Sequence, residues 1–407
     1  MQALQFTPWS ARGAYAAIAG RRTPDAWAGG PRSPLRLVDI APPTLPGPQW
    51  ARVDVSLGGI CGSDLKLLHV RGMSPVVTAF TDWRQPLILG HEIVGVVAEA
   101  GPQAGIEPGT RVVAEPVLSC VDRGWAPCPS CAAGHDHRCV RAADAGTLPA
   151  GHGFGFNARY GGGWAEQLVA PGWRCVPVPD PLDDADAVLV EPLAIAVHAV
   201  DRAAAPSSRA LVIGPGTLGL CTLIALRAVH PHVEVTMVGL GSVADEVCAH
   251  FGAAHVLHGT RGPLLEAAAA LTNGILRRPV VGPPVLDGGY DTVFDCVGSP
   301  QTIDDGLRLL RPGGELVLVA TSGKQRVDWS LVWLRELRVT GTVYYAQRPS
   351  GRRVFAAAVD IAMDVRPGRL VTHRFGLDAA PAALRTAAAG PAAGALKVAF
   401  APPLGRV

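Results

Sequence analysis

The chain has little lysine and no long apolar run. Lysine occurs only at positions 66, 324 and 397, so arginine supplies nearly all of the positive charge. The formal net charge is +2, which leaves no excess of positive charge for binding nucleic acid. No stretch approaches the roughly 18 apolar residues of a membrane-spanning helix. We therefore expect neither a nucleic acid nor a membrane as a partner.

The first residues also lack the basic stretch and apolar core of a secretory signal peptide, and positions 1–6 instead predict an opening strand. The nine cysteines are unevenly spread, at positions 61, 120, 128, 131, 139, 175, 221, 248 and 296. An odd, clustered set in a chain without an export signal favours reduced thiols and metal sites over disulfides. We expect a cytoplasmic protein.

The chain has 407 residues, which predicts two or three domains. Its sequence pattern changes near residue 200. Up to about residue 195, short apolar runs alternate with Gly and Pro turns and few helical periods occur, which predicts a compact β-rich domain. From about residue 207, apolar runs at 210–213, 233–238, 291–295 and 314–320 alternate with alanine-rich stretches. This alternation predicts a parallel α/β sheet. A closing strand is expected at 395–400.

A glycine-rich loop follows the apolar run 210–213 and precedes an expected helix that ends near Val229. It has the pattern G-x-G-x-x-G and consists of Gly214, Pro215, Gly216, Thr217, Leu218 and Gly219. Between a strand and a helix, such glycines let the backbone approach a pyrophosphate, whose charge faces the helix N-terminus. An ordinary tight turn is the alternative, but the context predicts dinucleotide binding.

The acid that usually binds the adenosine ribose is missing from its expected position. That position, at the end of the second α/β strand, falls on Gly239, whereas a carboxylate there would hold the ribose 2′-hydroxyl of NAD. Without the carboxylate nothing repels a 2′-phosphate, which favours NADP slightly. Arg277 or Arg278 could bind that phosphate, although a solvated loop is the simpler interpretation. The choice between NAD and NADP stays open.

Four separated residues offer ligands for an open metal site. Cys61 stands between glycines, two residues before Ser63, and a buried structural cysteine would not need such neighbours. His91 and Glu92 follow a glycine, and Glu191 lies in an apolar stretch where an unpaired carboxylate is costly. A structural histidine and an acid at a helix start are the alternatives. Together the thiol, imidazole and carboxylates form the mixed ligand set of a catalytic zinc.

A second group of cysteines lies within twenty residues and comprises Cys120, Cys128, Cys131 and Cys139. Four thiols in this arrangement predict a closed tetrahedral zinc site, which has no position for a substrate and is therefore structural. His135 or His137 could replace one thiolate. Two disulfides are the alternative, which an intracellular location disfavours.

These groups, in this order, resemble the zinc-dependent medium-chain alcohol dehydrogenase family, in its polyol, sugar and threonine dehydrogenase branch. The resemblance spans nearly the whole chain and rests on G-I-C-G-S-D, P-L-I-L-G-H-E-I-V-G, the cysteine lobe at about 115–142, V-E-P-L-A and G-P-G-T-L-G. It extends to the segments 291–298 and 312–319. It therefore adds Cys296 and Val319 to the expected cofactor-binding residues, beside Gly239.

The resemblance implies an α/β fold with a GroES-like β-rich catalytic domain (1–197) and a Rossmann domain with a doubly wound parallel sheet (198–345). The segment 346–407 would return to the catalytic domain, and the active site would lie between the two domains. Two zinc ions per chain, one catalytic and one structural, would accompany NAD or NADP. Members of the family form homodimers or homotetramers by joining their Rossmann sheets.

The implied reaction interconverts a secondary alcohol, or a polyol or sugar hydroxyl, with the corresponding ketone or aldehyde. Cys61, His91 and a glutamate would hold the catalytic zinc, and Ser63 would accept the proton of the small-molecule substrate. A zinc-free reductase of enones or quinones on the same scaffold is one alternative. A non-catalytic dehydrogenase-like binding protein is another.

Three features depart from the family pattern. The first two cysteines of the lobe are separated by seven residues instead of the usual two, which makes Cys120 the least secure ligand. Lys66 stands where a relay histidine is expected, with His69 further on. The third departure is Gly239. The outer proton path and the cofactor choice are therefore the least determined parts of the expected site.

Overall fold

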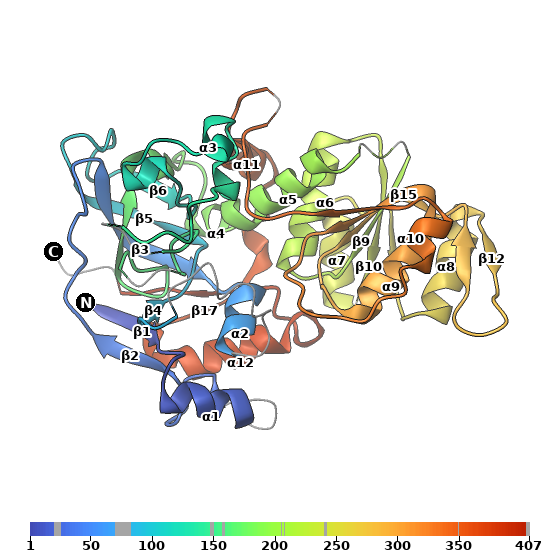
Figure 1. The fold of residues 1–407 in the computed structure, drawn as a ribbon, viewed down its shortest axis with the longest axis horizontal. Helices are drawn as coiled ribbons and strands as arrows, with labels where there is room; N and C mark the ends of the chain where they lie inside the picture. Colours follow the sequence, from blue (N-terminus) through green and yellow to red (C-terminus); the bar gives the residue numbers. More distant parts are fainter. Residues whose placement is uncertain are drawn as a thin grey trace. The chain divides into compact units, whose positions relative to one another are not determined.

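The computed structural model describes residues 1–19, 26–69, 83–146, 150–156, 159–204, 206, 208–239, 242–348 and 350–403. The chain divides into two compact units (Figure 1). The first unit comprises Met1–Glu191, Pro349–Ala389 and Lys397–Val407. The second unit comprises Pro192–Arg348 and Gly390–Leu396. The C-terminal part therefore contributes to both units.

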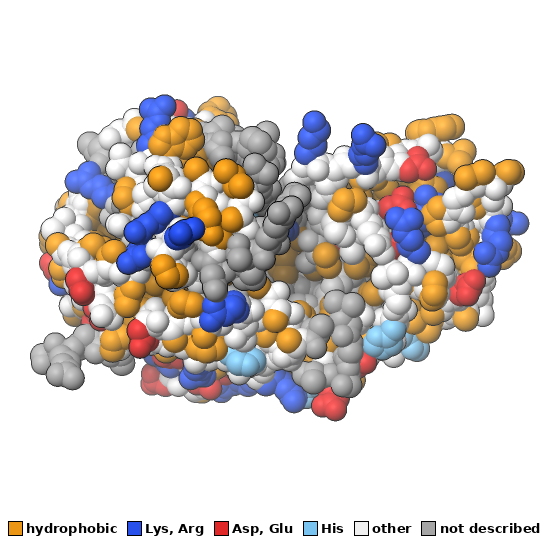
Figure 2. All heavy atoms as spheres, turned by 90° about the horizontal axis from the view of Figure 1, so that it is seen from below, with side chains coloured by type: hydrophobic (Ala, Val, Ile, Leu, Met, Phe, Trp, Pro, Cys, Tyr) orange, Lys and Arg blue, Asp and Glu red, His pale blue; other side chains and the backbone are white. Residues whose placement is uncertain are grey.

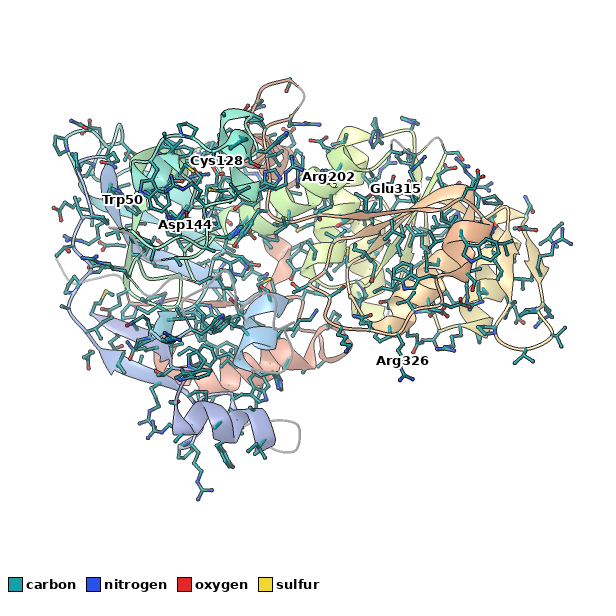
Figure 3. All side chains as sticks on the ribbon, viewed as in Figure 1. Trp50, Cys128, Asp144, Arg202, Glu315 and Arg326 are labelled. Atoms are coloured by element: carbon teal, nitrogen blue, oxygen red, sulfur yellow. The ribbon has the colours of Figure 1, made fainter. Side chains whose placement is uncertain are left out.

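A seven-stranded sheet organises the first unit, in the order β17-β18-β3-β5-β6-β8 with β7 beside β3. Its strands are β3 (Trp50–Gly59), β5 (Ile93–Ala100), β6 (Arg111–Ala114), β7 (Gln167–Pro171), β8 (Cys175–Pro177), β17 (Val371–Phe375) and β18 (Lys397–Phe400). All pairs are antiparallel except β17 with β18. Alternate residues of β3 are buried, as expected for a strand with one face on a core. Trp50 (labelled in Figure 3) stacks on Tyr160 in that core.

A smaller sheet of β2 (Leu35–Asp39), β1 (Gln2–Phe6) and β4 (Leu87–Ile88) completes the strands of this unit. Its helices are α1 (Ala11–Ala19), α2 (Gly62–Leu68), α3 (Pro129–Ala132), α4 (Asp184–Ala187), α11 (Val354–Val365) and α12 (Ala380–Ala389). Its short 3-10 turns are η3 (Val121–Arg123), η4 (Asp136–Arg138), η5 (Gly172–Arg174), η6 (Pro367–Leu370) and η7 (Leu377–Ala379). The sequence predicted the β-rich character but not α1, whose alanine-rich segment lies inside the stretch expected to form strands.

A six-stranded parallel sheet organises the second unit, in the order β11-β10-β9-β14-β15-β16. Its strands are β9 (Arg209–Ile213), β10 (Glu234–Val238), β11 (His255–Leu257), β14 (Tyr290–Asp295), β15 (Leu310–Leu318) and β16 (Arg338–Gly341). The helical segments are α5 (Val190–Arg202), which begins in the first unit, α6 (Thr217–Val229), α7 (Ser242–His250), α8 (Gly262–Thr272), α9 (Pro300–Leu309), α10 (Ser330–Leu334) and η8 (Pro391–Ala393). The predicted α/β sheet is confirmed, and the four predicted strands form its centre.

The hairpin of β12 (Ile275–Arg277) and β13 (Val285–Asp287) was not predicted. Its strands are short, and the arginine pair Arg277 and Arg278 with the prolines that follow it indicated a loop. Strand β16 was missed for a similar reason, since only four residues form it. Such short strands are stabilised by the neighbours they pair with rather than by a pattern of their own.

Within the described residues, no helix is long and apolar enough to cross a membrane. On the face drawn in Figure 2, Lys and Arg side chains are interspersed with acidic and apolar ones.

Candidate functional site

Cys61 lies in the tight connection between β3 and α2. It is the residue that caps the N-terminus of α2, and its backbone N–H donates a 2.9 Å hydrogen bond to Asp64 Oδ2. This bond satisfies an N–H near the helix start that would otherwise lack a partner. Ser63 follows in the first turn and is half-buried. The G-I-C-G-S-D sequence thereby fixes the backbone that carries the thiol and the hydroxyl.

Asp64 also faces His91. Its Oδ1 lies 3.4 Å from His91 Nδ1, and both side chains are buried. Burial by itself lowers the pKa of His91, but Asp64 and a hydrogen bond with Cys61 outweigh it and raise the pKa well above its usual 6.5. Because Nδ1 faces Asp64, Nε2 is the nitrogen left for a metal, the usual arrangement of a carboxylate behind a histidine ligand. The ring of Phe156 packs at 4.9 Å from that of His91.

Glu92 is bound by a lysine that the sequence analysis did not recognise. Lys397 Nζ donates to Glu92 Oε1 at 2.7 Å and to Oε2 at 2.6 Å, and to the carbonyl of Ile60 at 3.2 Å. Both members of the pair are almost completely buried. A side chain on Gly59 would begin 1.8 Å from Glu92 Oε2, so only glycine leaves room for this carboxylate.

Glu191 lies in the first turn of α5, directly before Pro192, and is buried. Burial raises the pKa of its carboxyl to about 7, and the charges of His91, Glu92 and Lys397 also act on it. Among the described residues Glu191 has no ion pair. Glu191 is therefore an acid at a helix start, which was the alternative interpretation of the sequence. It also lies near enough to His91 for the two charges to interact.

Cys61, His91, Glu92 and Glu191 have the donor atoms that zinc binds, but these atoms do not form a tight cluster. In the described ranges, only the four cysteines form a group of three or more ligand residues whose atoms lie within 4.8 Å of one another. Glu92 bonds to Lys397 instead, and His91 faces Asp64. A thiol, an imidazole and a carboxylate remain the donor set of an open zinc site. The ligand roles of Cys61, His91, Glu92 and Glu191 stay predictions.

The four cysteines of the lobe come together as a cluster, Cys120 included. All four sulfurs lie within 4.8 Å of one another, with Cys120 to Cys139 and Cys128 to Cys131 both at 3.5 Å. Burial opposes ionisation of Cys128, but hydrogen bonds from the backbone of Cys131 and Val140 lower its pKa to about 6. None of the nine cysteines is part of a disulfide. Four such thiols form a structural zinc cluster with a complete tetrahedral ligand set.

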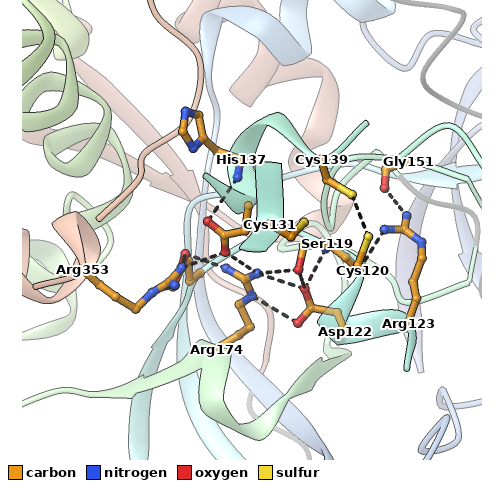
Figure 4. Close-up of polar contacts among 12 residues, drawn as sticks. Ser119, Cys120, Asp122, Arg123, Cys131, His137, Cys139, Gly151, Arg174 and Arg353 are labelled. Carbon is orange, nitrogen blue, oxygen red and sulfur yellow. Dashed lines mark hydrogen bonds and ion pairs between the residues drawn. The ribbon is translucent and has the colours of Figure 1, made fainter. Parts of the chain in front are cut away.

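A buried charge network lies beside this cluster (Figure 4). Arg174 donates to Glu115 at 2.7 Å, to Asp122 at 2.9 Å and to Asp136 at 2.8 Å. Arg353, at the start of α11, donates to Glu115 at 3.1 Å and to Asp136 at 3.2 Å. Asp122 lies in the seven residues between the first two cysteines. The unusually long spacing therefore supplies a carboxylate that binds Arg174. The sequence analysis missed this network because its members are distant in the chain.

The glycine-rich loop lies between β9 and α6, as predicted. Gly216 caps the N-terminus of α6, and a side chain there would meet only Pro391 at 4.0 Å. A side chain on Gly219 would begin 1.8 Å from the carbonyl oxygen of Gly214, so helix and strand approach too closely for any other residue. Thr217 Oγ1 donates to the carbonyl of Leu396 at 2.7 Å. The open backbone at a helix N-terminus fits a pyrophosphate.

The other expected cofactor residues lie at the same edge of the parallel sheet. Cys296 follows β14, and its sulfur is 3.5 Å from Thr222 Oγ1 on α6. Val319 follows β15 and donates its backbone N–H to the carbonyl of Asp295 at 3.0 Å. Gly239 follows β10 directly. The carboxyl ends of parallel strands are where open α/β sheets bind their ligands.

The two residues that depart from the relay pattern lie at the end of α2. Lys66 is in its last turn, and His69 caps its C-terminus. The ring of His69 packs against Trp27 at 4.2 Å, and burial lowers the pKa of this histidine.

Comparison with known proteins identifies the two units. Residues 47–180 match the alcohol dehydrogenase GroES-like domain, and residues 217–362 match the zinc-binding dehydrogenase domain. The chain is 30% identical to a sorbitol dehydrogenase of Arabidopsis thaliana over 84% of its own length and 86% of the relative's. It is 28% identical to an L-threonine 3-dehydrogenase of Deinococcus deserti, covering 85% and 90% of the two chains.

A solved structure shares this architecture. It is a Sinorhizobium meliloti 1021 protein assigned to the zinc-binding dehydrogenases and bound to NADP, with 29% identity and a TM-score of 0.66. The match covers 90% of the present chain and 95% of the other. With a GroES-like unit, a six-stranded parallel sheet and a four-cysteine zinc cluster, the chain belongs to the zinc-binding medium-chain alcohol dehydrogenase family and is an NAD(P)-linked enzyme of its alcohol and polyol dehydrogenase type.

Proposed function

We propose that the enzyme oxidises a secondary alcohol or a polyol or sugar hydroxyl to the carbonyl, and catalyses the reverse, with NAD or NADP. The observation that carries the proposal is the Cys61–Asp64–His91 arrangement. One buried carboxylate fixes the backbone of the thiol residue and faces the imidazole. The names of the sorbitol and threonine dehydrogenases point to a hydroxyl-bearing substrate of the same kind.

The ligands of the catalytic zinc are proposed to be Cys61, His91 and Glu191. Glu92 is less suited to direct ligation because Lys397 already binds both of its oxygens. Measuring the zinc content of the Glu191→Gln and Glu92→Gln variants distinguishes the two acids. When bound, zinc would supply a Lewis acid that lowers the pKa of a hydroxyl, and the oxidised dinucleotide would supply the hydride acceptor. Asp64 would orient His91, and Ser63 would accept the hydroxyl proton while passing its own proton outward.

We propose a second zinc ion at Cys120, Cys128, Cys131 and Cys139, with a structural role. The first unit, which includes Pro349–Ala389 and Lys397–Val407, would act as the catalytic domain, and the second unit would act as the dinucleotide-binding domain. Nine cysteines without a disulfide suit a reducing compartment, which supports the cytoplasm.

A second copy of the chain is the proposed partner, through the outer edge of the parallel sheet. Strand β16 ends the strand order, and an edge strand offers unpaired backbone groups to another chain. Exposed apolar residues of α10 and the segment after β16 accompany this edge, namely Trp333, Leu334 and Val343. A homodimer or a homotetramer would cover them, and the molar mass of the protein in solution tests this.

The function is tested by supplying the purified, zinc-loaded protein with NAD or NADP and a panel of secondary alcohols, polyols and sugars. Formation of the reduced nicotinamide with at least one alcohol is expected, with loss of activity after a zinc chelator and recovery after zinc is returned. A chelator removes activity because the alcohol hydroxyl loses its Lewis acid.

The same experiment distinguishes the two alternatives. Reduction of enones or quinones that persists after chelation, without oxidation of any alcohol, would establish a zinc-free reductase. Binding of a nicotinamide dinucleotide with no turnover of any substrate would support a non-catalytic protein.

A further inference from the structure

A carboxylate lies next to the place where a side chain on Gly239 would begin. A side chain on Gly239 would begin 2.7 Å from Asp245 Oδ1, with Val256 at 2.7 Å and His258 at 3.2 Å as its other nearest neighbours. Gly239 directly follows β10, and its backbone N–H donates to the carbonyl of Leu257 at 2.8 Å. The carboxylate of Asp245 therefore lies directly beside the place where the side chain of an acid at position 239 would begin.

Asp245 reaches this place from helix α7, six residues later in the chain. Its Oδ2 is 3.2 Å from His258 Nε2, which holds the carboxylate from one side. Its Oδ1, the oxygen next to Gly239, is buried and has no hydrogen-bond partner among the residues that the structure describes. A buried carboxylate oxygen without a donor is unfavourable, and a hydroxyl group could satisfy it.

We propose that Asp245 replaces the missing acid at position 239, accepts a hydrogen bond from the adenosine ribose, and makes the enzyme prefer NAD(H) to NADP(H). The inference rests on the proposed dinucleotide site at the glycine-rich loop. An acid at the end of this strand recognises the ribose 2′-hydroxyl. The same negative charge repels a 2′-phosphate. The proposal reverses the slight preference for NADP that the absence of a carboxylate at Gly239 suggested.

The two arginines considered for a 2′-phosphate are already engaged elsewhere. Arg277 pairs with Asp287 at 2.9 Å within the β12–β13 hairpin, and Arg278 pairs with Glu266 of α8 at 3.2 Å. Neither is among the nearest neighbours of the missing Gly239 side chain. Among the described residues, the three nearest groups are thus a carboxylate, a valine and a histidine, and none of the three is an arginine or lysine that would attract a phosphate.

The test is a fluorescence titration of the purified protein with NADH and with NADPH, which measures binding without turnover. Three proteins are compared: the natural chain, Asp245→Asn, and Glu246→Gln as a control. Glu246 is the next residue of α7 and is exposed, so its variant removes the same charge from the same helix. Asn keeps the size of Asp245, which limits any effect on folding.

The natural chain is expected to bind NADH more tightly than NADPH, by about tenfold to a hundredfold, the range of a lost charged hydrogen bond. Asp245→Asn should shrink this ratio by at least about tenfold, with tighter NADPH binding, while Glu246→Gln leaves it unchanged. A natural chain that prefers NADPH, or an Asp245→Asn ratio equal to that of the natural chain, would overturn the inference alone. No binding of either dinucleotide would overturn the proposed function with it.

Discussion

Lys397 and Glu92 form an ion pair in which each residue depends on the other. Both side chains are almost completely buried, and the lysine contacts both carboxylate oxygens. A buried charge that loses its partner keeps its desolvation cost, whereas replacing both charges by neutral groups removes that cost. The pair also holds β18 to the residues around Cys61, through the carbonyl of Ile60.

Lys397→Met should therefore lower the free energy of unfolding by about 3–5 kcal/mol. The double variant with Glu92→Gln should recover most of this loss, because no buried charge is left unpaired. Lys324→Met is the matched control, since Lys324 is exposed and its replacement should change stability by less than about 0.5 kcal/mol. Urea unfolding measures all three, and equal stability of the Lys397 and Lys324 variants would disprove the dependence.

At this scale the sequence revealed residues whose chemistry is unusual for their surroundings. Cys61, His91, Glu92 and Glu191 were found because a thiol, a histidine or an acid stood among glycines or apolar residues. Lys397 had the same signal, as a lone lysine in an apolar strand, but was interpreted only as part of that strand. The role of Asp64 could not be predicted, because it depends on the approach of α2 to His91, which lies two residues before β5.

The cysteine lobe shows how short elements are held in place. The turns η3, η4 and η5 each contribute to the network around Arg174, through Asp122, Asp136 and Arg174 itself. Burial alone would raise the pKa of Asp136, but Arg174 and Arg353 outweigh it and hold the pKa below its usual 3.8. A carboxyl with a lowered pKa in the folded state stabilises the fold above its unfolded pKa, and this contribution is lost as the pH falls through the folded value.

Asp136→Asn should consequently reduce the free energy of unfolding at neutral pH, and the difference from the natural chain should shrink as the pH falls below the usual aspartate range. Asp144→Asn is the control in the same lobe, because Asp144 forms only an exposed pair with Arg141, worth at most about 1 kcal/mol. Unfolding measured across acidic pH with zinc present tests this. A difference between Asp136→Asn and the natural chain that stays constant with pH would contradict the assignment.

The longer elements were predictable from local pattern, and the shorter ones were not. Strands β9, β10, β14 and β15 are apolar because a parallel sheet buries both faces, so their runs stood out in the sequence. The network around Arg174 and the β12–β13 hairpin depend on contacts between distant residues. The spacing of Cys120 and Cys128 was unusual in the sequence. The structure explains it, because Asp122 within this spacer binds Arg174.

On the scale of the whole molecule, the order of motifs predicted the family and the fold class, and both are confirmed. Motifs identify a family because each fixes a local backbone that its chemistry requires. They do not identify the substrate, whose contacts come from side chains without a fixed pattern. The preference for NAD or NADP could not be predicted from motifs either, because Asp245 approaches Gly239 only in the folded chain.

One proposed zinc ion, held by Cys61, would carry the reaction, and the other, held by the four cysteines, would stabilise the structure. The direct measurement is the zinc content per chain together with the alcohol-dependent reduction of the dinucleotide. Three proteins are compared: the natural chain, Cys61→Ala and the control Cys175→Ala. Cys175 is a buried cysteine outside both sites. We predict about two zinc ions for the natural chain and the control, and about one for Cys61→Ala, with activity lost and the unfolding transition retained. Two zinc ions and normal turnover in Cys61→Ala would contradict the account.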